Sequence, residues 1–275
     1  MTRGGTVTEQ VRTRTNGIEL NVATAGAGPP VVLLHGFPHT WRVWSEIIGP
    51  LSGGHRVLAP DLRGFGDSEA SGEGLDAGTL ATDIEGLLGG ESATVVALDA
   101  GVPVAFLLAL RRPDLVRRLV LVEGTLGTLP GAEDFLAGGP PWWFGFHAVP
   151  GLAETVLAGH EAEYVGWFYD QGTRGRGVRP DVREAFGRAY ARPGALGRTL
   201  GFYRALPRTG SQLAEAASRT RLTVPTTAIG AAPVGRALEQ QLRPLCEDLT
   251  GLVVPDCGHI VPLDRPAALL EALSL

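Results

Sequence analysis

The sequence contains no lysine and only two cysteines among its 275 residues. Two cysteines are too few for a disulfide framework, so we expect a reducing compartment, the cytoplasm. The formal net charge of −5 gives no attraction to nucleic acids or anionic membranes, and we expect neither as a partner. No uncharged apolar run reaches membrane-spanning length, and residues 1–10 lack the apolar core of a secretory signal.

Cofactor and metal motifs are missing as well. The chain has no P-loop and no complete G-x-G-x-x-G fingerprint. His39, His55, His147 and His160 lie far apart, without the spacing typical of metal ligands. We therefore expect no cofactor and no metal. The expected partner is a small-molecule substrate, and the chain is expected to be a monomer or a homodimer.

The composition supports a large folded core, because 44% of the residues are hydrophobic. Two short strands joined near Asn16-Gly17 open the pattern, and strands then alternate with helices up to Glu123. Such alternation predicts an α/β protein with a mostly parallel sheet flanked by helices, and a ligand site beyond the carboxyl ends of its strands. The expected strands are 11–15, 18–25, 31–34, 56–59, 94–98 and 119–122, and the expected helices are 41–51, 80–88 and 102–112.

The alternation stops after Glu123. Residues 125–212 show no clear buried strand but several patches with helical spacing, at 152–157, 161–169, 179–191 and 195–205. We interpret this segment as a helical cap inserted between core strands. The core then consists of residues 1–124 and 213–275, and it resumes with strands at 222–229 and 252–254 and a last helix at 266–273.

The segment VVALDAG, residues 95–101, has the pattern of a nucleophile elbow: a strand, a sharp turn with small flanking residues, then a helix. Asp99 stands where such elbows usually carry serine. A serine attacks acyl carbon, whereas a carboxylate suits displacement at alkyl carbon. The simpler alternative is that Asp99 caps the following helix, since aspartate favours that position.

Two further loops follow expected strands. In the segment HGFP, residues 35–38, Gly36 permits an unusual turn, and the N–H groups of Phe37 and Ala100 are candidates for an oxyanion hole. We also count His35 among the candidate substrate-binding residues. Near the end of the chain, His259 follows the last expected strand, which suits a general base.

In this order, HGFP, the glycine-punctuated loop at 61–68, the elbow and Gly258-His259 resemble the α/β-hydrolase fold, and Asp99 with HGFP resembles its epoxide hydrolase and dehalogenase branch. The resemblance implies that Asp99 attacks a substrate carbon and forms an alkyl ester, which a water activated by His259 then hydrolyses. An acidic residue should orient His259. Glu123 is our choice, because the loop after residues 222–229 holds no acid before Glu239. The alternative is that Glu123 only caps or pairs at the hinge of the cap.

The cap segment WWFGFHAVPG, residues 142–151, resembles that of epoxide hydrolases, and so does GFYRA at 201–205. The resemblance implies that Tyr203 donates a proton to the epoxide oxygen. Trp143 stands where tyrosine or histidine is common, and an indole N–H donates a hydrogen bond without being a proton source. Trp142 and Trp143 are therefore candidate substrate-binding residues, against the alternative that they only pack the cap.

Three functions remain open. Hydrolysis of an epoxide to a vicinal diol fits best, on a bulky or aromatic substrate that suits the aromatic cap, with secondary metabolism as the setting that bacterial relatives of the branch suggest. Haloalkane or haloacid dehalogenation fits less well, because Ala100 replaces the tryptophan typical of haloalkane dehalogenases and residues 101–105 lack the arginines of fluoroacetate dehalogenases. The third possibility is a non-hydrolytic member of the fold.

Overall fold

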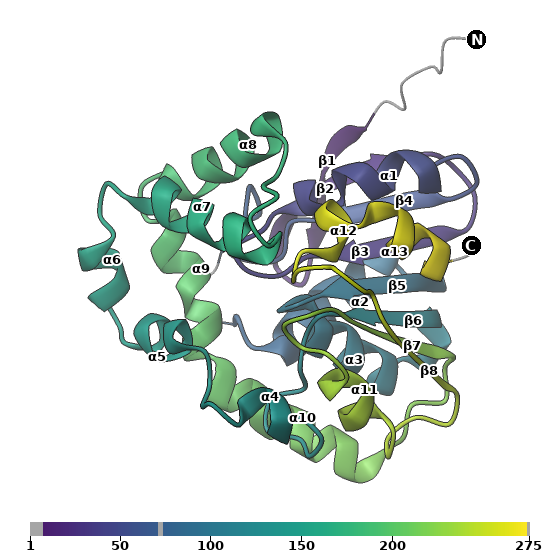
Figure 1. The fold of residues 1–275 in the computed structure, drawn as a ribbon. Coiled ribbons are helices and arrows are strands. Elements are labelled where there is room, and N and C mark those ends of the chain that lie inside the picture. Colours follow the sequence, from purple (N-terminus) through teal and green to yellow (C-terminus); the bar gives the residue numbers. More distant parts are fainter. Residues whose placement is uncertain (1–7, 71–73, 274–275) are drawn as a thin grey trace.

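The computed structural model describes residues 8–70 and 74–273 (Figure 1). Residues 1–7, on which part of the expectation about a secretory signal rests, lie outside the described residues. Among the described helices, none is both long enough and apolar enough to cross a membrane.

An eight-stranded sheet forms the centre of the protein, with the strand order β1-β2-β4-β3-β5-β6-β7-β8. Strand β2 runs antiparallel to both of its neighbours, and the pairs from β4 to β8 are parallel. The predicted α/β class with a mostly parallel sheet is confirmed. The strands are β1 (Glu9–Thr15), β2 (Ile18–Ala25), β3 (Pro30–Leu34), β4 (Arg56–Pro60), β5 (Ala93–Leu98), β6 (Val116–Val122), β7 (Thr226–Gly230) and β8 (Leu249–Val253).

Helices flank the sheet (Figure 1). Helix α1 packs with α12 and α13, while α2 packs with α3 and α10. Strands β3 and β5 are buried along their whole length, as expected for strands covered on both faces. The helices are α1 (Ser45–Leu51), α2 (Ala77–Leu88), α3 (Gly101–Arg111), α4 (Glu133–Leu136), α5 (Trp142–Ala148), α6 (Leu152–Val156), α7 (Glu161–Gly172), α8 (Pro180–Ala191), α9 (Ala195–Arg204), α10 (Leu206–Arg219), α11 (Ala237–Leu242), α12 (Val261–Asp264) and α13 (Pro266–Leu273).

The strand expected at residues 222–229 is shorter than predicted. Strand β7 begins at Thr226, and Leu222 forms only an isolated bridge with Cys246. The reason is Pro225, which has no N–H to donate to a strand ladder.

Residues 125–212 contain helices α4 to α9 and the first half of α10. Figure 1 shows this segment, which we call the cap, to one side of the sheet. The boundary that we predicted at residue 212 falls inside α10, which continues to Arg219 and packs on α2 and α3 of the core. The division into a core and a cap stays a proposal.

Two tyrosine hydroxyls fasten the cap to the loop that follows β3. The hydroxyl of Tyr169, on α7, donates a hydrogen bond of 2.5 Å to the Pro38 carbonyl. The hydroxyl of Tyr190, on α8, donates one of 3.3 Å to the His39 carbonyl. Both rings are buried, so water does not compete for these hydrogen bonds. The bonds therefore hold α7 and α8 of the cap against the loop after β3.

Candidate active site

Asp99 and Glu123 lie side by side because of the strand register. Leu98 at the end of β5 is paired with Val122 at the end of β6, so each acid is the first residue beyond its strand. Both backbones turn sharply there, with φ of 53° at Asp99 and 45° at Glu123. This left-handed conformation is uncommon for residues other than glycine, and it is often found at functional sites.

The contacts of the Asp99 carboxylate are those of an elbow residue, not of a helix cap. It accepts a hydrogen bond of 2.8 Å from the Phe37 N–H and another from the Ala100 N–H. A capping carboxylate would accept from N–H groups within the first turn of α3, and the residue at the cap position is Ala100, without a side-chain bond. The N–H groups of Phe37 and Ala100, which we predicted to form an oxyanion hole, therefore donate to the Asp99 carboxylate in this structure.

Gly36 allows this close approach. A β-carbon at residue 36 would stand 2.2 Å from the Asp99 Oδ1 and 2.6 Å from the Ala100 nitrogen. Any larger residue would therefore displace the carboxylate or the elbow, which explains why glycine occupies this position in the HGFP segment.

The imidazole of His259 lies between the two acids. Its Nε2 is 3.3 Å from the Asp99 Oδ2, and its Nδ1 is 3.0 Å from the Glu123 Oε2. Glu123 is completely buried, and its other oxygen accepts a hydrogen bond from the Ala231 N–H after β7. The side chains of Asp99 and His259 keep 29% and 26% exposure, so a molecule in a cavity can reach them.

Burial and hydrogen bonding shift the pKa values of His259 and Asp99 in opposite directions. Burial alone lowers the pKa of His259, but its hydrogen bonds with Asp99 and Glu123 outweigh burial and raise the pKa to about 10. Burial likewise raises the pKa of Asp99, yet the hydrogen bond and charge of His259 hold it below its ordinary value. Pairing with Asp99 and Glu123 therefore favours the protonated form of His259.

Tyr203, on α9, faces the same site. Its side chain is 6% exposed and lines a small cavity of about 50 Å³ together with Asp99, His259 and Trp143. Burial, and next the charge of Asp99, raise its pKa well above the ordinary value, so the hydroxyl keeps its proton. The neighbouring side chain of Trp143 acts in the opposite direction and lowers the pKa of Tyr203, as an N–H donor to the phenol oxygen does.

Two candidate substrate-binding residues lie elsewhere than we predicted. His35 is fully buried, with its Nδ1 2.9 Å from the Gly36 carbonyl and its Nε2 accepting from the Leu62 N–H at 3.0 Å, so it braces loops instead of facing a cavity. Trp142 is 57% exposed and does not line the cavities around Asp99 in the described part of the chain. We therefore withdraw both as substrate-binding candidates.

Two larger cavities open on either side of Asp99. The α7-side cavity, about 200 Å³, is bordered by Glu123, Trp167 and Phe168. The α10-side cavity, about 710 Å³, runs along Phe202, Leu206 and Leu213. Phe135 and Phe144 line both cavities. Among the described lining residues the only charged groups are those of Asp99, Glu123 and His259, which pair with one another, so neither cavity offers a free cation to an anionic substrate.

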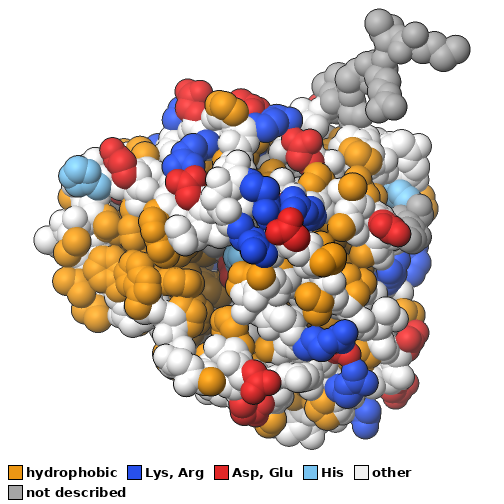
Figure 2. All heavy atoms as spheres, viewed as in Figure 1, with side chains coloured by type: hydrophobic (Ala, Val, Ile, Leu, Met, Phe, Trp, Pro, Cys, Tyr) orange, Lys and Arg blue, Asp and Glu red, His pale blue; other side chains and the backbone are white. Residues whose placement is uncertain are grey.

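The surface beside the α7-side cavity is also apolar. Figure 2 shows hydrophobic side chains gathered on the cap next to a hollow between the cap and the core. Five exposed apolar side chains lie in or between helices α5 and α7, namely those of Trp142, Val149, Leu152, Val156 and Trp167.

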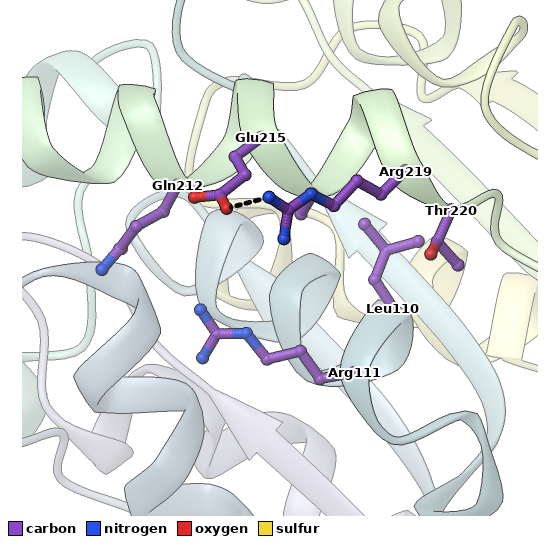
Figure 3. Close-up of a pocket in the computed structure, with 7 residues that line it drawn as sticks. Leu110, Arg111, Gln212, Glu215, Arg219 and Thr220 are labelled. Carbon is purple, nitrogen blue, oxygen red and sulfur yellow. Dashed lines mark ion pairs between the residues drawn. The ribbon is translucent and has the colours of Figure 1, made fainter.

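A further pocket lies between α3 and α10, away from Asp99 (Figure 3). Its volume is about 320 Å³, and its charged residues include Arg111, Glu215 and Arg219. Glu215 and Arg219 pair with each other at 2.9 Å, and both are largely exposed. An exposed ion pair offers a ligand little, because water already solvates both groups.

Some lining residues escaped the sequence analysis. His39 was considered only as a metal ligand, yet it lines the small cavity, and both of its ring nitrogens lack a hydrogen-bond partner among the described residues. Its position directly after HGFP could have indicated that it lies at the site. Phe135, Phe144 and Phe168 gave no signal beyond being aromatic, because their directions depend on how the cap helices pack.

Comparison with known proteins identifies the family to which the chain belongs. A family model described as the alpha/beta hydrolase fold matches residues 29–266. The chain therefore belongs to the α/β-hydrolase fold family, and it falls in the epoxide hydrolase branch, so the predicted membership is confirmed. It is 30% identical over 277 residues to the soluble epoxide hydrolase of a Corynebacterium species, covering 93% of this chain and 92% of that protein.

Solved structures show the same relationship. The epoxide hydrolase CorEH superposes with a TM-score of 0.87 at 27% identity, covering 97% of each chain. Cfl2 from Burkholderia cenocepacia superposes with a TM-score of 0.88 at 28% identity, covering 96% of this chain and 94% of that one. The protein is thus a hydrolase of the α/β-hydrolase fold.

Proposed function

We propose that the protein hydrolyses an epoxide to a vicinal diol through a covalent ester on Asp99. The observation that carries this proposal is the arrangement of Asp99 beside His259, with Tyr203 facing both across one small cavity. The arrangement supplies a nucleophile, a base and a proton donor on the two sides of a bound epoxide.

In the first step an oxygen of Asp99 attacks an epoxide carbon, and the bond from that carbon to the ring oxygen breaks. The ring oxygen takes the proton of Tyr203 and becomes the first product hydroxyl. The hydrogen bond from Trp143 to the Tyr203 oxygen stabilises the phenolate that results. Ester formation removes the negative charge of Asp99, so the pKa of His259 falls, and the proton that His259 releases restores Tyr203.

In the second step neutral His259 takes a proton from water, and the hydroxide attacks the ester carbonyl. The N–H groups of Phe37 and Ala100, which hold the carboxylate in the free protein, hold the developing oxyanion. The ester then breaks at its acyl carbon, and the leaving alkoxide takes the proton from His259. The remaining carboxylic proton of Asp99 passes to His259, which returns the site to its starting charges.

The cavities support a bulky, uncharged substrate. About 710 Å³ on one side of Asp99 and about 200 Å³ on the other leave room for substituents on both sides of the ring, and their walls are mostly apolar. The α10-side cavity has no cation among its described lining residues, and in the α7-side cavity the charge of His259 is already paired with Asp99 and Glu123. A buried substrate carboxylate would therefore find no free cation, at a cost of several kcal/mol. This disfavours haloacids and favours apolar or aromatic epoxides.

A single turnover in oxygen-18 water tests the covalent route. The oxygen from water should appear in the Asp99 carboxylate after the first turnover, because water attacks the acyl carbon and not the substrate carbon. Mass spectrometry of the product and of the peptide that contains Asp99 measures this. Label found directly in the first-turnover diol would contradict the covalent route.

Replacing Tyr203 with phenylalanine should slow ester formation by about 100-fold, because the ring oxygen loses its proton donor. Phenylalanine keeps the edge contacts of this ring with Phe37 and His147, so the protein should still fold. Pre-steady-state kinetics of ester formation measures the effect. Tyr164→Phe is the matched control, because Tyr164 contacts His147 but does not line the small cavity among the described residues. Equal losses in both variants would count against Tyr203 as the donor.

Decay of the ester should accelerate as pH rises. His259 must be neutral to accept a proton from water, and it is neutral above its pKa. That pKa, about 10 in the free protein, should be lower in the ester because Asp99 has lost its charge. Rapid-mixing measurement of ester decay should give a midpoint below 10. A rate that stays constant between about pH 5 and about pH 10 would disagree with His259 as the base.

Dehalogenation remains the second candidate, since Trp143 and Trp167 both line the α7-side cavity and indole N–H groups can bind halide. Halide release from a panel of haloalkanes, compared with diol formation from epoxides, separates the two functions. We prefer epoxides because Tyr203, which lines the small cavity with Asp99, can give a proton to the ring oxygen.

A further inference from the structure

The loop that carries His259 is held on both sides of that residue. We define the His259 loop as residues 254–260, between β8 and α12. The Gly258 N–H donates a hydrogen bond of 2.6 Å to the Asp264 Oδ2, at the end of α12. The Ile260 N–H donates one of 2.9 Å to the carbonyl of Gly172, the last residue of α7 in the cap. The two backbone N–H groups that flank His259 are therefore fixed, one by the core and one by the cap.

The cap also packs directly against this backbone. A β-carbon at residue 258 would stand 2.3 Å from the Gly172 carbonyl oxygen. The end of α7 thus lies against the loop at the residue immediately before His259. A small displacement of the cap would change the space that this loop can occupy.

Arg176, which follows α7 in the cap, joins Asp256 within the loop to Asp264 at the end of α12. Its Nε donates to the Asp264 Oδ1 at 2.6 Å, and its Nη2 donates to the Asp264 Oδ2 at 2.5 Å. The same Nη2 donates to the Asp256 carbonyl at 3.1 Å. This planar, two-pronged pairing suits a guanidinium and would not be reproduced by the point charge of a lysine.

The buried carboxylate of Asp264 depends on its ion pair with Arg176. Its side chain is 1% exposed, and a carboxylate removed from water needs a close, hydrogen-bonded cation. The nearest other cation, Arg265, is 3.6 Å from the Oδ1 and donates at 2.6 Å to the exposed Asp256. Without Arg176, the Asp264 carboxylate, which holds the Gly258 N–H, loses both of its hydrogen bonds from a cation.

We propose that Arg176 is a positioning residue through which the cap keeps the His259 imidazole between Asp99 and Glu123. It does so by fixing Asp264 and Asp256, which hold the His259 loop in place. The hydrolytic step then depends on contact between the cap and the core, whereas attack by Asp99 does not use His259 as a base. The statement about the hydrolytic step rests on the proposed function; the statement about the position of His259 does not.

The test first measures the position of His259 without any substrate. Nuclear magnetic resonance titration of labelled histidines reports the pKa of His259, and a His259→Gln variant identifies its signal. The charged groups that face this imidazole are Asp99 and Glu123, with His39 beside them from the loop after β3. In Arg176→Met the two hydrogen bonds of His259 should loosen, so its midpoint should fall by about one pH unit.

The sign of the shift separates positioning from a plain charge effect. Removal of a nearby cation raises the pKa of an imidazolium, because one repulsive charge is gone. A lower midpoint in Arg176→Met therefore supports positioning, and an unchanged or higher midpoint in the folded variant overturns it. Arg176→Lys should recover part of the shift, since it restores the charge without the two-pronged geometry.

Arg179→Met is the matched control. Arg179 also pairs from the cap to the core, at 2.7 Å from Glu46 on α1, but it does not contact the His259 loop. Its loss should leave the His259 midpoint unchanged. With an epoxide, Arg176→Met should slow ester decay by about tenfold and leave ester formation within about twofold, while Arg179→Met should change neither. Equal slowing in both variants, or slowing of ester formation alone, would overturn the proposal.

Arg176→Gln covers the case in which Arg176→Met does not fold. The glutamine amide can still donate one hydrogen bond to Asp264, but the charge and the two-pronged pairing are lost. The His259 midpoint should again fall, whereas loss of the cation alone would raise it, so an unchanged or higher midpoint would overturn the proposal. If no epoxide forms an adduct with the His259→Gln variant, the proposed function fails, and the titration still decides whether Arg176 positions His259.

Discussion

Replacing Asp99 with asparagine should reduce diol formation by at least about 10⁴-fold, because an amide oxygen is a poor nucleophile toward alkyl carbon. Asparagine has nearly the same shape and can still accept from the Phe37 and Ala100 N–H groups, so the elbow should keep its geometry. The loss should therefore appear in ester formation and not in folding. Intact-protein mass spectrometry after incubation with an epoxide should detect no adduct.

The control for this variant is Asp114→Asn. Asp114 pairs with Arg112 on the surface just before β6, at the opposite end of that strand from Glu123, and does not line the cavities among the described residues. The activity of this variant should therefore match that of the unmodified protein. Mass spectrometry must also exclude deamidation of residue 99, which would regenerate aspartate. Activity of Asp99→Asn within about tenfold of the original would support the third possibility, a fold member that does not use a covalent ester.

Replacing His259 with glutamine should separate the two chemical steps. Asp99 keeps its charge, so an epoxide should still alkylate it, but no base remains to activate water. The ester should accumulate to about one per protein, and steady-state turnover should fall by at least about 1000-fold. Mass spectrometry should place a mass increase equal to that of the epoxide on the peptide containing Asp99.

His160→Gln provides the comparison for this second variant. His160 is exposed just before α7 and does not line the cavities in the described residues, so its loss should affect neither step. The proposed roles would be wrong if His259→Gln gave no adduct with a substrate that the unmodified protein converts. They would also be wrong if an adduct formed and then decayed at the original rate.

Two neighbouring tryptophans of the cap face in different directions, and the sequence did not distinguish them. Trp142 and Trp143 are neighbours in the chain, and successive residues on a helix point about 100° apart. On α5 this places Trp143 in the cavities and leaves Trp142 57% exposed. The sequence contains both indoles but not the rotation of α5, which is set by its packing against α9. For this reason only the structure could choose between the two tryptophans.

Local patterns predicted other parts of the site well. An elbow is built from consecutive residues, so the segment 95–101 was enough to place Asp99 at a strand-to-helix turn. Glu123 could be located because the family resemblance implies an acid after one of two core strands, and only residues 119–122 are followed directly by one. The register of β5 and β6 then brings it beside Asp99. His35 was harder, because its burial depends on the Leu62 and Gly36 backbone and not on its place after β3.

The sequence by itself determined the α/β class, the elbow with its acidic residue, and the pairing of Asp99 with a distant histidine. Each of these follows from short-range patterns or from strand order. The tertiary structure alone decided which aromatic side chains face Asp99, how the space around it divides into two cavities, and how Arg176 reaches the His259 loop. These features depend on contacts between segments far apart in the chain, such as the 2.6 Å bond from Arg176 to Asp264. Residue spacing does not encode them, because packing of the cap against the core sets their directions.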